Sequence, residues 1–97
     1  MNFSEIVQLL RAHFPELQEK FGLKGLSLFG SVARGDATIG SDLDVLVEFE
    51  RSPTFDQYMD TKFYLEDLTG MPVDLVTKGA LKSRIRLSVE QEAVRVA

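Results

Sequence analysis

The sequence predicts a small α/β (α+β) domain in which a mixed β-sheet has helices packed on one face. Short runs that alternate apolar and polar residues, as strands do, are separated by segments with helical periodicity. The composition supports this reading, because 44% apolar and 27% charged residues are typical of an ordinary globular protein. At 97 residues, the chain is expected to form a single domain over residues 1–97.

The charge balance argues against several classes of function. The formal net charge is −4, whereas a protein that coats nucleic acid needs a basic surface, so no direct nucleic-acid binding is expected. The chain has no cysteine, which excludes disulfides and thiolate zinc sites. No apolar run is long enough to cross a membrane and no signal peptide is recognised, so a cytoplasmic location is expected. Residues 77–97 are basic on balance, while residues 1–76 are acidic.

The first segment reads as a helix that Ser4 is expected to cap. Pro15 either kinks this helix or begins a second, shorter one, which ends before Gly22. The single histidine, His13, is expected on the helix surface rather than in a catalytic site. The apolar face of the helix comprises Ile6, Leu9, Leu10 and Phe14.

Residues 24–29 read as a short strand that runs directly into Gly30 and Ser31. Glycine lets the backbone come close to a ligand, and the residues that follow can open a helix. Exposed amides at a helix start, with a serine hydroxyl beside them, bind phosphate. We therefore expect a phosphate-binding turn at Gly30 and Ser31.

A second strand is predicted from Asp42 to Phe49. Because side chains alternate along a strand, Asp42 and Asp44 lie on one face, roughly 7 Å apart. Carboxylate oxygens at this spacing suit Mg²⁺, which is usually bound by one or two carboxylates together with substrate phosphates. The alternative is a solvated strand edge whose charges block aggregation.

The rest of the chain completes the predicted sheet. Residues 52–54 start a helix, with a cap followed by proline in the first turn, and Gly70 ends it. Its apolar residues are expected in the core: Phe55, Tyr58, Met59, Phe63, Leu65 and Leu68. Residues 73–76 form a third strand. Because an acid in so apolar a strand is costly to bury unpaired, Asp74 is expected to have a partner, most simply a metal shared with the earlier acids. Residues 81–93 read as an amphipathic helix and residues 94–96 as an extended tail.

Gly30-Ser31, ten residues, and then Asp42-x-Asp44 resemble the signature of the DNA polymerase beta-type nucleotidyltransferase superfamily. The wider string LFGSVARGDATIGSDLDVLVEFE is similar to its minimal nucleotidyltransferase (MNT) group. The resemblance implies the polymerase beta-type nucleotidyltransferase fold. It also implies that Asp42, Asp44 and Asp74 are the catalytic residues and hold Mg²⁺, two ions in all, with ATP as the substrate.

The resemblance also implies how the nucleotide is held. Gly30 and Ser31 would bind its β- and γ-phosphates, and Ser41 would orient one of the metal-binding acids. Arg34 has two readings of equal weight. It reaches a phosphate or a carboxylate of the site, or it forms a structural salt bridge that pins the loop after it.

MNT proteins typically pair with a HEPN-domain protein in toxin–antitoxin modules. The resemblance thus implies an antitoxin that transfers AMP from ATP to a tyrosine of a HEPN ribonuclease toxin, encoded by the adjacent gene. Two alternatives stay open: a small-molecule nucleotidyltransferase of the antibiotic-modifying type, and a binding-only antitoxin without catalysis. The absence of an acceptor-binding domain counts against the first, and the three intact acids count against the second. Base preference, acceptor residue and stoichiometry are not encoded in any motif of the sequence.

Overall fold

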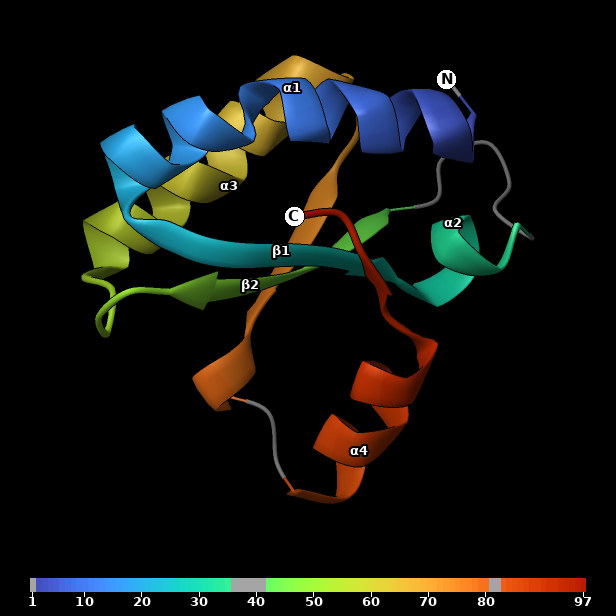
Figure 1. The fold of residues 1–97 in the computed structure, drawn as a ribbon. Coiled ribbons are helices and arrows are strands. Elements are labelled where there is room, and N and C mark those ends of the chain that lie inside the picture. Colours follow the sequence, from blue (N-terminus) through green and yellow to red (C-terminus); the bar gives the residue numbers. More distant parts are fainter. Residues whose placement is uncertain (1, 36–41, 81–82) are drawn as a thin grey trace.

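The chain forms helices and strands in an order that brings residues far apart in sequence onto one sheet (Figure 1). The computed structural model describes residues 2–35, 42–80 and 83–97, with the backbone alone for residues 83–86. The elements are α1 (Phe3–Phe21), β1 (Leu23–Phe29), α2 (Gly30–Arg34), β2 (Leu43–Phe49), α3 (Phe55–Thr69), β3 (Val73–Thr77), the 3-10 turn η1 (Lys78–Ala80), α4 (Ser83–Glu92) and β4 (Val94–Arg95).

The sheet has four strands in the order β3-β2-β1-β4. β1 is antiparallel to both of its neighbours, β2 and β4, whereas β2 and β3 are parallel. Parallel strands need a crossover connection, and α3 supplies it. The mixed α/β fold is as the sequence predicts. The C-terminal tail that was expected to be extended adds β4 to the sheet edge.

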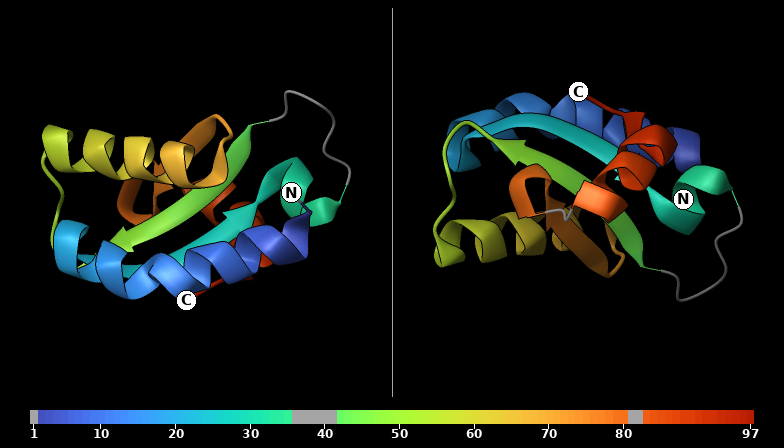
Figure 2. Two further views of the ribbon diagram at one scale, coloured as in Figure 1. Left: turned by 90° about the horizontal axis from the view of Figure 1, so that it is seen from above. Right: turned by 90° about the horizontal axis from the view of Figure 1, so that it is seen from below.

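Helices α1 and α3 cover one face of the sheet, and α4 stands on the other side (Figures 1 and 2). The two covering helices contact each other through Tyr64, whose ring meets Phe21 edge-on at 5.5 Å between centroids and whose hydroxyl donates a hydrogen bond to Glu16. Within the described residues, no helix is both long and apolar enough to cross a bilayer.

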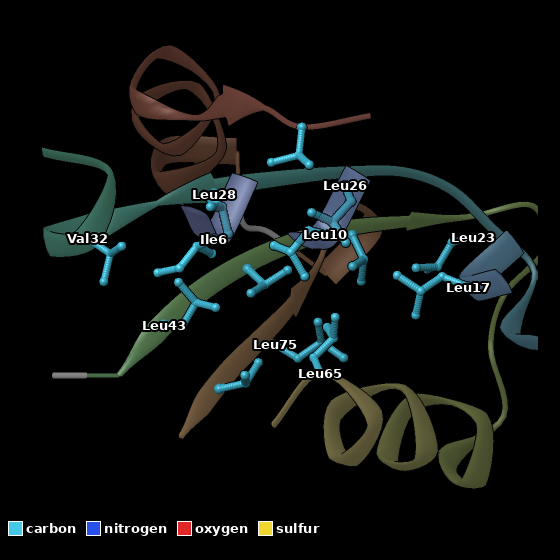
Figure 3. Close-up of a cluster of buried hydrophobic side chains, with 14 residues drawn as sticks. Ile6, Leu10, Leu17, Leu23, Leu26, Leu28, Val32, Leu43, Leu65 and Leu75 are labelled. Atoms are coloured by element: carbon cyan, nitrogen blue, oxygen red, sulfur yellow. The ribbon is translucent and has the colours of Figure 1, made fainter. Parts of the chain in front are cut away.

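The hydrophobic core lies between the sheet and these two helices, where Figure 3 shows side chains from both layers pointing toward one another. The tail also enters it, because Val96 is 4% exposed and its carbonyl accepts a hydrogen bond of 2.9 Å from Arg11 Nε on α1. The buried cluster comprises Ile6, Leu10, Leu17, Leu23, Leu26, Leu28, Val32, Leu43, Val45, Val47, Leu65, Val73, Leu75 and Val96.

The first helix begins earlier than predicted and is continuous. Asn2, rather than Ser4, is the N-cap, in a reciprocal capping box with Glu5. Pro15 lies inside α1 and starts no second helix. His13 is on this helix as predicted, half-buried, with Nδ1 2.9 Å from the Leu9 carbonyl oxygen.

The start of α3 also differs from the prediction. Thr54 is the N-cap, so Pro53 precedes the cap instead of occupying the first turn. Two of the aromatic residues expected in the core are exposed, Phe55 at 76% and Phe63 at 50%. Of that set, Leu65 is fully buried, and Tyr58 and Leu68 pack against the core.

Candidate active site

The phosphate-binding turn predicted at Gly30 packs directly against the predicted acidic pair. Gly30 begins α2 with a φ of +73°, a left-handed conformation that side chains disfavour. A Cβ atom at Gly30 would lie 1.9 Å from Oδ2 of Asp44, far inside van der Waals contact. Glycine is therefore required at this position for two reasons: the backbone conformation, and the close contact with the Asp44 carboxylate. This contact joins the two halves of the sequence signature in space.

The strand register brings a second acid beside the first. Asp44 on β2 and Asp74 on β3 are Cα partners in the parallel pair. Neighbouring strands lie about 4.8 Å apart, and partners in one register point to the same face. That face is opposite to the one covered by α1 and α3, because Val45 and Leu75 alternate with these acids and are buried.

The other features of the acids are only partly as predicted. Asp74 is exposed, so the burial cost that was the reason for expecting a partner does not arise. β3 is an edge strand whose acid-bearing side points away from α1 and α3. Asp42 lies just before β2 and is also exposed.

The environment disfavours charge on Asp44. Burial raises its pKa above the ordinary aspartate range, and the negative charges of Asp74 and Asp42 raise it further. The positive charge of Arg34 acts in the opposite direction. The three acids are thus close enough to influence one another, and a cation at this position would relieve their repulsion.

One further residue near the acids was not predicted from the sequence. The Tyr58 hydroxyl donates a hydrogen bond to the carbonyl of Leu75, next to Asp74. Burial, and then the charge of Asp74, raise the pKa of this phenol. In the sequence Tyr58 is one of several apolar-stripe residues of a helix, and nothing there distinguishes it from a core residue.

Arg34 forms an ion pair with a residue of α4. Its Nη1 lies 3.0 Å from Oε1 of Glu92, which links α2 to α4. A salt bridge is therefore present, with a partner 58 residues away, whereas the loop that it was expected to pin lies outside the described residues. Ser31 stands half-exposed in α2. Ser41, which was expected to orient an acid, lies outside the described residues.

The side chains of this site fit Mg²⁺ in part. The donors are carboxylates, the hard oxygen ligands that Mg²⁺ prefers. Among the described residues, however, no group of three Asp, Glu, His or Cys side chains is arranged to hold a metal ion by itself. Asp44 and Asp74 supply the one or two carboxylates that Mg²⁺ usually takes from protein, and substrate phosphates normally supply further oxygens.

Comparison with known proteins settles the family. The profile of the nucleotidyltransferase domain matches residues 10–96, which include the turn and the three acids. This chain belongs to the nucleotidyltransferase domain family.

Relatives of similar length are found in archaea. The chain is 44% identical over 96 residues to the protein adenylyltransferase MntA of Thermococcus cleftensis, covering 99% of this chain and 97% of that protein. It is also 44% identical over 94 residues to MJ0128 of Methanocaldococcus jannaschii, a candidate protein adenylyltransferase, with 96% of each chain covered.

Solved structures confirm the fold. A structure described as a minimal nucleotidyltransferase superposes with a TM-score of 0.81 at 38% identity, over 97% of this chain and 95% of that one. The MNT antitoxin in complex with the tri-AMPylated HEPN toxin of Shewanella oneidensis superposes with a TM-score of 0.68, over 94% of this chain and 71% of that one. At 18% identity, this second likeness concerns the fold.

Proposed function

We propose that this chain is a protein adenylyltransferase antitoxin, which transfers AMP from ATP to a tyrosine of a HEPN toxin. The observation that carries the proposal is the contact between the Gly30 turn and Asp44, with Asp74 in register beside them. A phosphate-binding turn and a pair of carboxylates on one sheet face are the parts that nucleotidyl transfer needs. The relative named protein adenylyltransferase MntA, 44% identical along nearly the whole chain, supports the choice of acceptor class.

The reaction balances as a phosphoryl substitution. The tyrosine oxygen attacks the α-phosphorus of ATP, the bond from that phosphorus to the α,β-bridging oxygen breaks, and pyrophosphate leaves. The hydroxyl proton passes to a base, for which we propose the exposed carboxylate of Asp74. The amides of Gly30 and Ser31 hold the β- and γ-phosphates at the start of α2.

We propose that Arg34 also binds the triphosphate, at the same end of the site. It already contributes a positive charge near Asp44, and a triphosphate would compete with Glu92 for its guanidinium. We also retain Ser41 as a residue that orients one of the acids.

We propose that Asp42, Asp44 and Asp74 hold Mg²⁺, with two ions when ATP is bound. The bound ions would neutralise the triphosphate and stabilise the attacking and leaving oxygens. The support is chemical, since the donors are all carboxylates and the pKa of Asp44 is raised by burial and by its acidic neighbours.

The partner is proposed to be a HEPN toxin encoded by the adjacent gene, without direct binding of nucleic acid by this chain. Because ATP is the substrate, we place the reaction in the cytoplasm. The basic residues Lys82, Arg84 and Arg86 are further candidates for contact with the partner. The side chains of all three lie outside the described part of the chain.

Co-expression with the adjacent gene product tests the proposal. The wild type is expected to restore growth and to add the mass of AMP to the partner, whereas Asp74→Asn should abolish the mass gain, because an amide is a poor metal ligand and no base. Asp67→Asn, at an exposed position on α3, is the matched control and should transfer AMP normally.

Two results would contradict the enzymatic reading. Full protection by Asp74→Asn without any mass gain would mean that binding alone neutralises the toxin. Absence of AMP on the partner with the wild type, together with its transfer to a small acceptor, would favour the small-molecule alternative.

A further inference from the structure

A polar cavity lies on the same face of the sheet as the acidic pair. Its volume is about 260 Å³, and residues of β1, β2, η1, α4 and β4 line it. Sites for small molecules begin at about 300 Å³, so the cavity is large enough for one ring system but not for a whole nucleotide. None of the site residues identified above lines it.

Along β2, the cavity lies next to the acidic pair. Leu46 lines it and stands two residues after Asp44 on β2, so both point to the same face, roughly 7 Å apart along the strand. Leu46 is only 7% exposed although it faces away from the core between the sheet and α1 and α3. Helix α4 stands on this side (Figure 2) and supplies Glu90 to the cavity wall, and Ala93, just after the helix, also lines it.

An ion pair ties this wall to the phosphate-binding turn. Glu92, on α4, binds Arg34 at the end of α2 with 3.0 Å between Oε1 and Nη1. The same helix carries Glu90 to the far side, where its Oε1 lies 3.9 Å from Nζ of Lys78 on η1. The end of helix α4 therefore contacts both α2, through Arg34, and η1, whose Lys78 lines the cavity.

The walls of the cavity offer a hydrogen-bond donor beside an acceptor. The Lys78–Glu90 pair is wide, and its side chains are 40% and 36% exposed, so a ligand in the cavity can reach both groups. Adenine presents this combination on one edge, with N7 as acceptor and the N6 amino group as donor, whereas guanine presents two acceptors there. The Leu46 and Ala93 side chains add apolar surface, which suits the face of a base.

We propose that this cavity binds the adenine base of ATP while the Gly30 turn binds its phosphates. Lys78 donates to a ring nitrogen, Glu90 accepts from the amino group, and the ribose spans the interval from Asp44 to Leu46. The inference rests on the proposed function, since it assigns the base of the same substrate. A tyrosine side chain of the partner fits less well, because burying its apolar ring among Glu48, Lys78 and Glu90 would desolvate charges that it cannot pair.

Two variants separate binding of the base from binding of the phosphates. Ala93→Leu fills the cavity, and Glu90→Gln weakens the acceptor for the amino group. Calorimetry with Mg²⁺ present would measure the affinity of each for ATP and for inorganic tripolyphosphate, which has no base. The matched control is Glu19→Gln, the same chemical change at an exposed site on α1.

Glu90→Gln should bind ATP about tenfold more weakly, the factor that corresponds to weakening one charge-assisted hydrogen bond. Ala93→Leu should also bind ATP more weakly, because the added side chain occupies the space of the base. Tripolyphosphate should bind both with unchanged affinity, and the control should match the wild type for both ligands. GTP should bind the wild type more weakly than ATP does. Melting temperatures show that each variant is folded, and Glu90→Gln carries the test if Ala93→Leu does not fold.

Three results would overturn the inference. Unchanged ATP affinity in a folded Glu90→Gln and Ala93→Leu would place the base elsewhere, even if AMP transfer to the partner continues. Equal weakening of ATP and tripolyphosphate would show that the cavity acts only through the phosphate site. Normal ATP affinity with loss of transfer would assign the cavity to the acceptor. Conversely, ATP binding that depends on the cavity, without transfer by the wild type, would overturn the proposed function alone.

Discussion

At the scale of single residues, Gly30 is the most constrained position of the site. Two separate features oppose a side chain there. The φ is +73°, and an added Cβ would lie 1.9 Å from Oδ2 of Asp44. Gly70 has a similar φ, +69°, but nothing within 4 Å of the position of its Cβ. The two glycines therefore allow backbone strain to be distinguished from collision with the carboxylate.

We predict that Gly30→Ala and Gly70→Ala each lose stability from the positive φ, by about 1–2 kcal/mol. For a domain of this size, each 1 kcal/mol of lost stability lowers the melting temperature by roughly 4–8 °C. Only Gly30→Ala should also lose ATP binding, because Asp44 must move. Calorimetry of ATP binding beside thermal unfolding checks both effects, and normal ATP affinity in Gly30→Ala would refute the close packing.

The residues of the site that the sequence could predict are those whose chemistry is local. Gly30 and Ser31 follow a strand directly, and Asp42 and Asp44 share one face by alternation, so short-range pattern is sufficient. Tyr58 and Glu92 could not be found in this way, since their contacts with Leu75 and Arg34 depend on how α3 and α4 pack. No short-range pattern marks a contact made over such separations.

At the scale of elements, the strands were predicted better than the helix ends. Apolar runs bounded by glycine and proline mark β2 and β3, because buried strands need apolar residues throughout one face. The burial predicted at the start of α3 was wrong, because an apolar stripe does not reveal where the sheet stops covering the helix. Phe55, in the first turn, fits the stripe and is nevertheless 76% exposed.

The contact between α1 and α3 leads to a prediction about alkaline pH. Burial and the hydrogen bond to Glu16 raise the pKa of Tyr64 to about 12, and burial raises that of Tyr58 as well. Absorbance titration should therefore show no tyrosine ionising near its ordinary pKa of 10. Since the pKa is raised in the folded state, the stabilisation is complete below pH 10 and is lost as the pH rises through about 12.

Glu16→Gln should lower the pKa of Tyr64, because the acceptor loses its charge. Glu19→Gln, an exposed neighbour on the same helix, should leave the titration unchanged. Titration of Tyr64 at pH 10 in the folded wild type, identified by its loss in Tyr64→Phe, would show that the two helices are not joined by this hydrogen bond.

At the scale of the whole molecule, the site depends on long-range pairing that composition does not specify. The acids of β2 and β3 meet because the strands are parallel and in register, so that Asp44 pairs with Asp74. A shift by one residue would turn Asp74 to the other face. The fold thus concentrates negative charge in a protein whose net charge is already −4.

This concentration of charge predicts how stability responds to pH and Mg²⁺. The pKa of Asp44 is raised in the folded state, so its contribution is complete below the ordinary aspartate pKa and is lost as the pH rises through the raised value. Without metal, the protein should therefore lose stability on leaving the acidic range. At neutral pH, Mg²⁺ that binds only the folded state should restore it, by about 2.7 kcal/mol at a hundred times its dissociation constant.

Thermal unfolding at several pH values, with Mg²⁺ or with a chelator, measures both effects. Asp44→Asn should be more stable than the wild type in chelator at neutral pH, because it removes a partly buried charge next to Asp74 and Asp42. The same variant should respond far less to Mg²⁺, whereas Asp67→Asn should respond as the wild type does. An equal response to Mg²⁺ in Asp44→Asn would place the ion away from the sheet face that carries the acids, and the turn at Gly30 that we propose binds phosphate would then have no metal beside it.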